Sequence, residues 1–240
     1  MRAGKGMAGQ SSVEFLIALP LLILLLFGII QFALIYQARA TLNHATLLAA
    51  RAGALHNGED AEMRAALAAG LTPLFVTAPS EGAYLKAREE VKLKETAKAL
   101  NLAKIEVLNP TRAAFTDFAR ARLDGKAGRE LPNDTLNYRN TSAGGASKIS
   151  VQDANLLHVR VTYCYRLIVP VLDRVIYATV NAMTSSDSSL SANGMSDPFG
   201  TNDAVTRPRC VNPLSPKQKR IEIRSEAFVR MQTPFYESNL

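Results

Sequence analysis

Tryptophan is absent from this chain, and it contains only two cysteines and three histidines. With aromatic residues at 7%, the missing tryptophan argues against an aromatic-lined platform for sugars or nucleic acids. Two cysteines exclude a disulfide-dense mini-scaffold and a four-cysteine zinc site. The histidines are scattered and form no H-E-x-x-H motif, so a zinc-protease centre is not indicated.

The motifs of nucleotide and acyl chemistry are missing as well. The sequence has no G-x-x-x-x-G-K-[ST] loop and no G-x-S-x-G elbow. Its net charge of +7 comes from dispersed basic residues, which does not favour nucleic-acid binding. We therefore predict no enzymatic activity, no cofactor, no metal, no nucleic acid and no small-molecule substrate. One question stays open, because acidic and amide side chains in the polar loop 184–206 could bind calcium although they miss the EF-hand spacing.

The most prominent feature that is present is an apolar run over residues 15–36. It contains no charged residue, and Gln31 is its only strongly polar side chain. As a helix rising about 1.5 Å per residue, these residues span about 33 Å, which is enough to cross the hydrocarbon core. Since soluble helices are rarely apolar on every face, the run predicts a transmembrane segment.

Three kinds of segment compete for this pattern: a cleaved secretory signal, an uncleaved anchor and a prepilin-type N-terminus. Ala38-Arg39-Ala40 is similar to a signal-peptidase site, but signal peptides have shorter apolar regions, of about 7–15 residues. The prepilin type explains more residues. Positions 1–9 form a basic leader that ends in Gly9, and Glu14 would be the fifth residue after a cut between Gly9 and Gln10.

This arrangement resembles the type IV prepilins, and the residues G-Q-S-S-V-E-F and the apolar helix after them are similar to the TadE-like family of pilin-like proteins. That family recurrently has a V-E-F run, a following proline (Pro20 here) and an Ala/Arg-rich continuation. The resemblance implies a minor pilin or pseudopilin of a tight-adherence (Tad) pilus, cut after Gly9 by prepilin peptidase. It implies the pilus assembly platform and other pilins as partners.

The resemblance assigns assembly and register to Glu14, Phe15 and Pro20. A carboxylate beside the bilayer is costly unless it is paired. Cleavage creates an α-amine on Gln10, and Glu14 of one subunit can pair with that amine of a neighbour. Alternatively, Glu14 only marks the membrane interface, and Pro20 either bends the helix or is a tolerated membrane-helix proline.

The expected location is the bacterial inner membrane, with a single pass. The basic residues that flank the apolar run are nearly balanced, so the positive-inside rule does not decide the orientation. The leader places residues 1–9 in the cytoplasm and residues 58–240 in the periplasm. Two alternatives remain: an uncleaved single-pass inner-membrane protein with a periplasmic binding or adaptor domain, and a soluble exported protein released after Ala40.

The sequence predicts one continuous helix over residues 10–57, which extends beyond the apolar run, with a break near Arg39 as the alternative. Ala45, Ala49 and Gly53 recur every four residues, and such small side chains let another helix approach closely. Asn57-Gly58 is a good stop signal.

The rest of the chain alternates between helical and strand patterns. Helices are expected over 59–69, 81–102 and 111–123 and from Pro170, and the charged run 86–98 is expected to be a solvated helix face. Strands are expected over 104–108, 157–167 and 221–231, and loops over 124–150 and 184–206. The predicted fold class is α+β: a long N-terminal helix packed on a small antiparallel sheet with additional helices, as in pilins.

The two cysteines, Cys164 and Cys210, lie 46 positions apart. If this part of the chain is exported to an oxidising compartment, we expect them to form a disulfide. The alternative is two unpaired, inert thiols, because the sequence does not determine the pairing geometry.

Overall fold

A computed structural model describes residues 10–170, 172–179, 210, 215 and 218–240. The chain divides into two compact units, which are treated separately below. One unit comprises residues 1–37 and 166–205, and the other comprises residues 38–165 and 206–240. The predicted leader 1–9 and the predicted polar loop 184–206 lie outside the described residues.

Helix α1 runs from Gln10 to Leu55, 46 residues, with Pro20 inside it and no interruption at Arg39. It ends where the sequence predicts a stop. Asn57 and Gly58 both have positive φ, 57° and 79°, and the Gly58 N–H donates to the Gly53 carbonyl. Glycine is required at position 58, because a Cβ there would lie 2.1 Å from the ring of Phe235.

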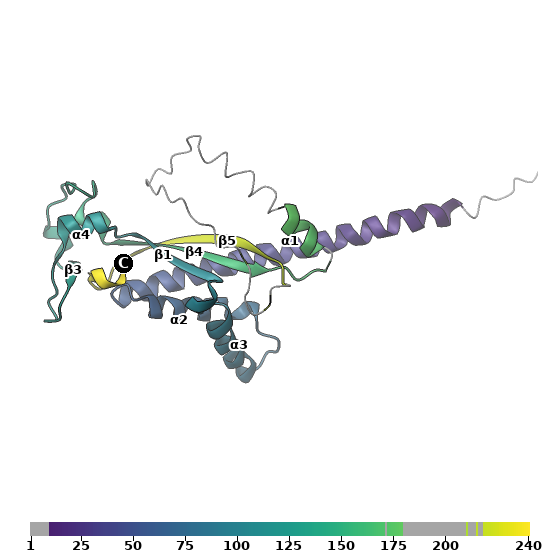
Figure 1. The fold of residues 1–240 in the computed structure, drawn as a ribbon, viewed down its shortest axis with the longest axis horizontal. Helices are drawn as coiled ribbons and strands as arrows, with labels where there is room; N and C mark the ends of the chain where they lie inside the picture. The colour runs from purple at the N-terminus through teal and green to yellow at the C-terminus, as the bar shows by residue number, and fades with distance from the viewer. Residues whose placement is uncertain (1–9, 171, 180–209, 211–214, 216–217) are drawn as a thin grey trace, which may run out of the picture. The chain divides into compact units, whose positions relative to one another are not determined.

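Helices α2 and α3 of the second unit follow α1 in the chain (Figure 1). Helix α2, Asp60–Leu71, is followed by the turn η1, Thr72–Leu74. Helix α3, Glu81–Lys94, begins at Ser80, whose hydroxyl accepts the Ala83 N–H as an N-cap. The predicted extension of this helix to residue 102 is wrong. The C-cap residue Glu95 is buried, because it makes contacts with distant parts of the chain. The chain then makes the short turn η2, Lys98–Leu100.

The main sheet has the strand order β1-β4-β5 (Figure 1), with bounds β1 Ala103–Asn109, β4 Leu156–Arg166 and β5 Arg220–Arg230. Strands β1 and β4 are antiparallel, and Ile105 lies opposite Val161. The alternating pattern of residues 157–167 predicts a strand with one buried and one solvated face, and this prediction is wrong. Residues on both faces of β4 are buried, among them Tyr163 and His158, and the His158 ring is covered by the ring of Phe228 from β5, 3.9 Å away.

A second small sheet was not predicted. It has the order β2-β3-β6, with bounds β2 Arg120–Ala121, β3 Arg129–Leu131 and β6 Phe235–Tyr236. The predicted helix 111–123 is shorter, α4 Arg112–Phe118, and the predicted loop 124–150 contains β3 and the turn η3, Leu136–Tyr138. Helix α5, Val151–Ala154, precedes β4, and η4, Glu237–Asn239, follows β6.

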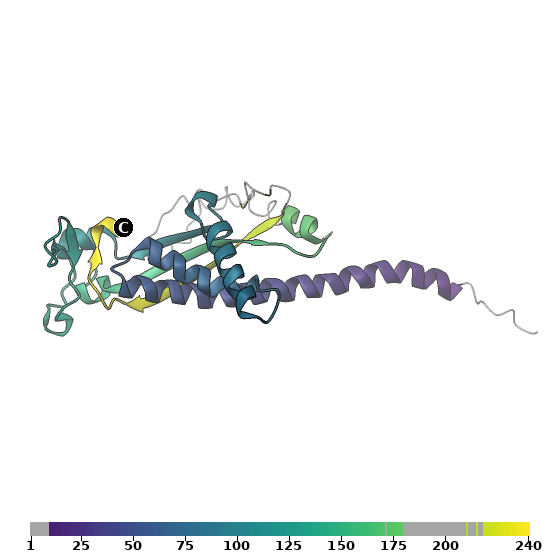
Figure 2. The ribbon, with the colours of Figure 1, turned by 90° about the horizontal axis from the view of Figure 1, so that it is seen from below.

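The core of the second unit lies between the second half of α1, helix α2 and the sheets (Figure 2). Leu42, Met63, Leu67 and Tyr163 are among its largest fully buried side chains, and Phe115 meets Phe235 edge-on at 6.1 Å. Each such side chain stabilises the fold by about 1.5–3 kcal/mol through burial. The long N-terminal helix, the three-stranded antiparallel sheets and the additional helices confirm the predicted α+β class.

Candidate functional site

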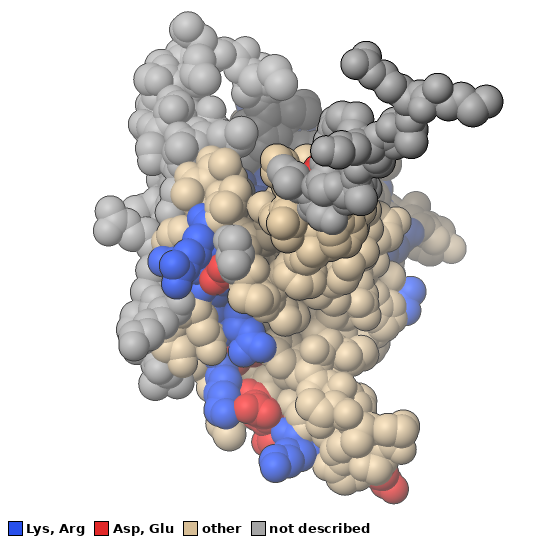
Figure 3. All heavy atoms as spheres, turned by 90° about the vertical axis from the view of Figure 1, so that its right-hand side faces the viewer, with Lys and Arg blue, Asp and Glu red and all other residues tan. Residues whose placement is uncertain are grey.

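The first half of α1 presents its apolar side chains outward. Phe15, Leu16 and Ile17 are each more than half exposed, and Figure 3 shows a mostly uncharged surface over this half of the helix. Among the described residues, the stretch Glu14–Leu55 is long and apolar enough to cross a membrane. An exposed surface of this kind is stable only in lipid or against other apolar helices. The chain is therefore a membrane-associated protein.

The residues assigned to processing and assembly lie at the start of this helix. Gly9 is outside the described residues, and Gln10 is the first residue of α1. Glu14 and Phe15 are exposed on the first turns, and Pro20 lies in the continuous helix one to two turns later. Their outward position leaves these side chains accessible to another chain.

Two of the small residues in the second half of α1, Ala45 and Gly53, lie against helix α2. Ala45, Ala49 and Gly53 are buried, and a Cβ added at Gly70 of α2 would lie 2.5 Å from the Ala45 Cα atom. At the other end of the contact, a Cβ added at Gly53 would lie 2.8 Å from the sulfur of Met63. The close approach of α1 and α2 therefore depends on glycine or alanine on both helices.

Replacing Gly70 by alanine is expected to destabilise the second unit by about 1–3 kcal/mol. Alanine is the better helix former by up to about 1 kcal/mol, but the two helices would have to move apart. The matched control is Gly82→Ala in α3, where a Cβ would meet no atom within 4 Å. Urea unfolding of the full chain in detergent, followed by circular dichroism, measures both. Equal midpoints for the two variants would contradict the close packing.

Cys164 and Cys210 are joined in the structure by a disulfide, with their Cα atoms 5.3 Å apart. Cys164 lies on β4 and is 1% exposed, and Cys210 precedes β5 in the chain. The bond links the central strand to the segment that leads into the edge strand. It closes a 46-residue separation, which restricts the unfolded chain.

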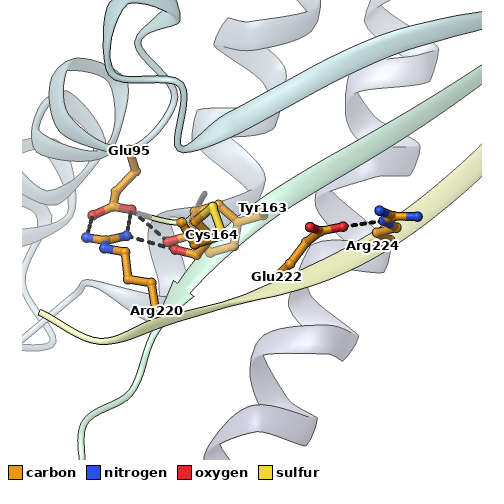
Figure 4. Close-up of a disulfide and its surroundings, with 7 residues drawn as sticks. Glu95, Tyr163, Cys164, Arg220, Glu222 and Arg224 are labelled. Atoms are coloured by element: carbon orange, nitrogen blue, oxygen red, sulfur yellow. Dashed lines mark hydrogen bonds and ion pairs between the residues drawn. A yellow bond between two sulfur atoms is a disulfide. The ribbon is translucent and has the colours of Figure 1, made fainter. Parts of the chain in front are cut away.

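A buried ion pair lies beside this disulfide (Figure 4). Two nitrogens of the Arg220 guanidinium donate to the two carboxylate oxygens of Glu95, at 2.8 and 3.0 Å. The side chains of Arg220 and Glu95 are 2% and 9% exposed. Arg220 also donates to the Cys164 carbonyl at 2.8 Å, so the pair connects the end of α3 to β4 and β5. Bidentate geometry of this kind is the strongest form of carboxylate–arginine contact.

The Tyr163 hydroxyl completes this cluster by donating to Glu95 at 2.9 Å. Burial, together with the neighbouring Glu95 carboxylate, raises the pKa of the Tyr163 phenol well above its ordinary value. The phenol therefore stays protonated and remains a donor. The hydrogen bonds of the cluster join the end of α3 to β4 and β5, which is a structural role.

The prediction that the charged run 86–98 is a solvated helix face is wrong at residue 95, and this cluster was therefore not predicted. The sequence does contain a signal for it. Ala87 and Val91 are buried on α3, and residue 95 continues that face at four-residue spacing. Among the described residues, no group of three or more His, Cys, Asp or Glu side chains is placed to hold a metal ion.

Comparison with known families gives one match. The model of the TadE-like protein family matches residues 9–51, which confirms the resemblance drawn from Gly9, the V-E-F run and Pro20. Neither a curated protein nor a solved structure matches the chain. The match, which covers the N-terminal part of the chain, supports a component related to the Tad pilus.

Proposed function

We propose that this protein is a TadE-like minor pilin or pseudopilin, a structural or assembly component of a Tad pilus. The observation that carries the proposal is the family match over residues 9–51, which begins at Gly9 and covers the exposed first half of α1. The size of the region that follows α1 argues against the major pilin, because the major pilin of these systems is very short. On this proposal the protein has no enzymatic activity.

The proposed topology is a single pass through the inner membrane over residues 15–36, with residues 1–9 in the cytoplasm. Residues 58–240 then lie in the periplasm. The disulfide Cys164–Cys210 supports this side of the membrane, because disulfides persist in oxidising compartments such as the periplasm.

The proposed mechanism starts with cleavage by prepilin peptidase between Gly9 and Gln10. The new α-amine lies about one helical turn before Glu14, at the start of α1. Glu14 of one subunit then pairs with the α-amine of a neighbour while the apolar faces of their α1 helices pack. At about 4 Å and an effective dielectric near 20, the attraction is about 4 kcal/mol before desolvation. Because opposite charges must meet, the pair sets the axial register of the subunits.

Pro20 and Phe15 have supporting roles in this proposal. Pro20 removes one hydrogen bond of the α1 backbone and gives the helix a site at which it can bend during packing. Phe15 offers a large apolar contact directly beside Glu14. The partners are prepilin peptidase, the pilus assembly platform and other pilins.

The mass of the mature N-terminus tests the processing step. We expect the protein recovered from cells to begin at Gln10. A start at Met1 would instead indicate an uncleaved membrane protein with a periplasmic binding or adaptor domain. A start at Thr41 would indicate a soluble exported protein.

The variant Glu14→Ala tests the register step. We expect normal cleavage but at least about a tenfold loss of assembled pili, which corresponds to about 1.4 kcal/mol. Glu62→Ala is the matched control, because Glu62 is an exposed acidic residue on α2, which belongs to the other compact unit. Pili counted by electron microscopy give the result. Unchanged pilus numbers in Glu14→Ala would remove the proposed register role.

A further inference from the structure

Gln31, the one strongly polar side chain in the apolar run, is fully buried in its unit. Its Oε1 atom accepts two backbone N–H groups, from Val169 at 2.8 Å and from Ile168 at 3.3 Å. Residues 168 and 169 belong to the same compact unit as the first half of α1. The side-chain amide of Gln31 therefore links the segment that follows β4 to the apolar half of α1 through two hydrogen bonds.

The fastened segment is itself apolar. Residues 167–172 read L-I-V-P-V-L, and the chain is helical over residues 172–179. Leu167, Val169 and Leu172 are buried, whereas Ile168 is 53% exposed and Val175 is 51% exposed. Two large apolar side chains of this segment thus point away from its packed side.

The segment also lies at the depth of the apolar run. Gln31 is five residues before Tyr36, about 7.5 Å along the helix. Pro170 and Leu172 share a hollow of about 340 Å³ with one apolar stripe of α1, made of Leu19, Pro20, Ile23, Leu24 and Phe27. The nearest of these α1 residues to Tyr36, Phe27, lies about 13.5 Å from it along the helix. The segment therefore lies beside residues of α1 that are inside the apolar run, and not only beside its end at Tyr36.

We propose that residues 168–170 and 172–179 insert into the lipid interface beside α1 and form a second membrane contact, with Ile168 and Val175 among the acyl chains. This inference rests on the proposed membrane span 15–36. Irregular backbone is tolerated in lipid only where its N–H groups are bonded. Gln31 satisfies the N–H groups of Ile168 and Val169, and Pro170 has no N–H to satisfy.

Lipid fits this surface better than a second copy of the chain does. Ile168 is exposed and its N–H is bonded to Gln31, and the neighbours of Gln31 on α1, Ile30 and Phe32, are exposed apolar residues that the proposed span already places in lipid. The next residues, Asp173 and Arg174, supply charge at the start of the helical stretch, and Arg174 is exposed. A short helix with charged and apolar faces is typical of a segment that inserts at a membrane surface. A long arginine side chain can reach toward the headgroups while its apolar neighbours lie among the acyl chains.

Because the chain has no tryptophan, a single introduced tryptophan reports on one position. The full chain is reconstituted in phosphatidylethanolamine–phosphatidylglycerol vesicles that carry brominated acyl chains, and fluorescence is also measured with acrylamide in the water. The test variants are Ile168→Trp and Val175→Trp. Phe32→Trp marks the lipid-exposed side of α1, and Tyr84→Trp on α3 marks the aqueous phase.

We expect brominated lipid to quench the tryptophans of Ile168→Trp and Val175→Trp at least half as strongly as that of Phe32→Trp. Acrylamide is expected to quench strongly only in Tyr84→Trp. If Phe32→Trp responds to lipid and the two test variants respond only to acrylamide, the interfacial insertion is overturned and the membrane span stands. Protection of the test variants from both quenchers would assign this surface to a second copy and overturn the inference. If Phe32→Trp does not respond to lipid either, the membrane span itself fails.

The variant Gln31→Leu tests the fastening. In this background we expect Ile168→Trp to become accessible to acrylamide, because the Ile168 and Val169 N–H groups lose their acceptor. Phe32→Trp should be unaffected by the same change, because its lipid contact does not depend on residues 168–169. An unchanged Ile168→Trp signal would show that Gln31 does not hold the segment in the interface.

Discussion

Replacing Arg220 by methionine is expected to lower the free energy of unfolding by about 3–5 kcal/mol. The variant leaves the Glu95 carboxylate buried with the Tyr163 hydroxyl as its remaining side-chain donor. A buried charge without its counterion costs far more than the pair itself contributes. Urea unfolding of the full chain in detergent, followed by circular dichroism, measures the loss.

The same strand offers a matched control. Arg224 on β5 pairs with Glu222, but the side chain of Arg224 is 44% exposed (Figure 4). Arg224→Met is therefore expected to change the free energy of unfolding by at most about 1 kcal/mol. An equal loss in the two variants would show that burial of the Glu95–Arg220 pair has no energetic consequence.

A second change separates charge from packing. Glu95→Gln in the Arg220→Met background removes the uncompensated charge and keeps an acceptor for the Tyr163 hydroxyl. We expect the double variant to recover part of the stability that Arg220→Met loses. If it recovers none, the loss comes from the packing of the Arg220 side chain and not from the buried carboxylate.

Removal of the disulfide is the other change with a large expected effect. In the chain-entropy model, a loop of 46 residues contributes about 4 kcal/mol, so Cys164→Ala/Cys210→Ala should lower the free energy of unfolding by about that amount. The single variant Cys210→Ala keeps the buried Cys164 side chain and should lose nearly as much. A loss confined to variants at Cys164 would assign the effect to packing on β4 and not to the cross-link.

The helical content of α1 could be predicted because its signals are local. Apolar side chains on every face and the Asn57-Gly58 stop lie within the segment they shape, and the structure ends α1 at Leu55. The small residues Ala45, Ala49 and Gly53 could be recognised by their spacing. The packing of α2 against Ala45 could not be predicted. The contact between Gly70 and Ala45 depends on the direction in which the turn after α1 leads the chain.

Elements whose pairing partners are distant in the chain were missed. Strand β3 has only three residues, which carry little strand signal of their own, and it pairs Glu130 with Tyr236 and Leu131 with Phe235. The predicted helix 81–102 was too long for a related reason. Glu95 leaves the helix to meet Arg220, a residue 125 positions away.

By itself, the sequence determined that this protein has a long apolar N-terminal helix with the TadE-like pattern around Gly9, Glu14 and Pro20, because those features are written in contiguous residues. Only the tertiary structure decided which buried polar groups find partners. Glu95 meets Arg220, and Gln31 meets the backbone of residues 168–169. A buried polar group without a hydrogen-bond partner destabilises the folded state. Only the folded chain brings the distant partner residue within hydrogen-bonding distance.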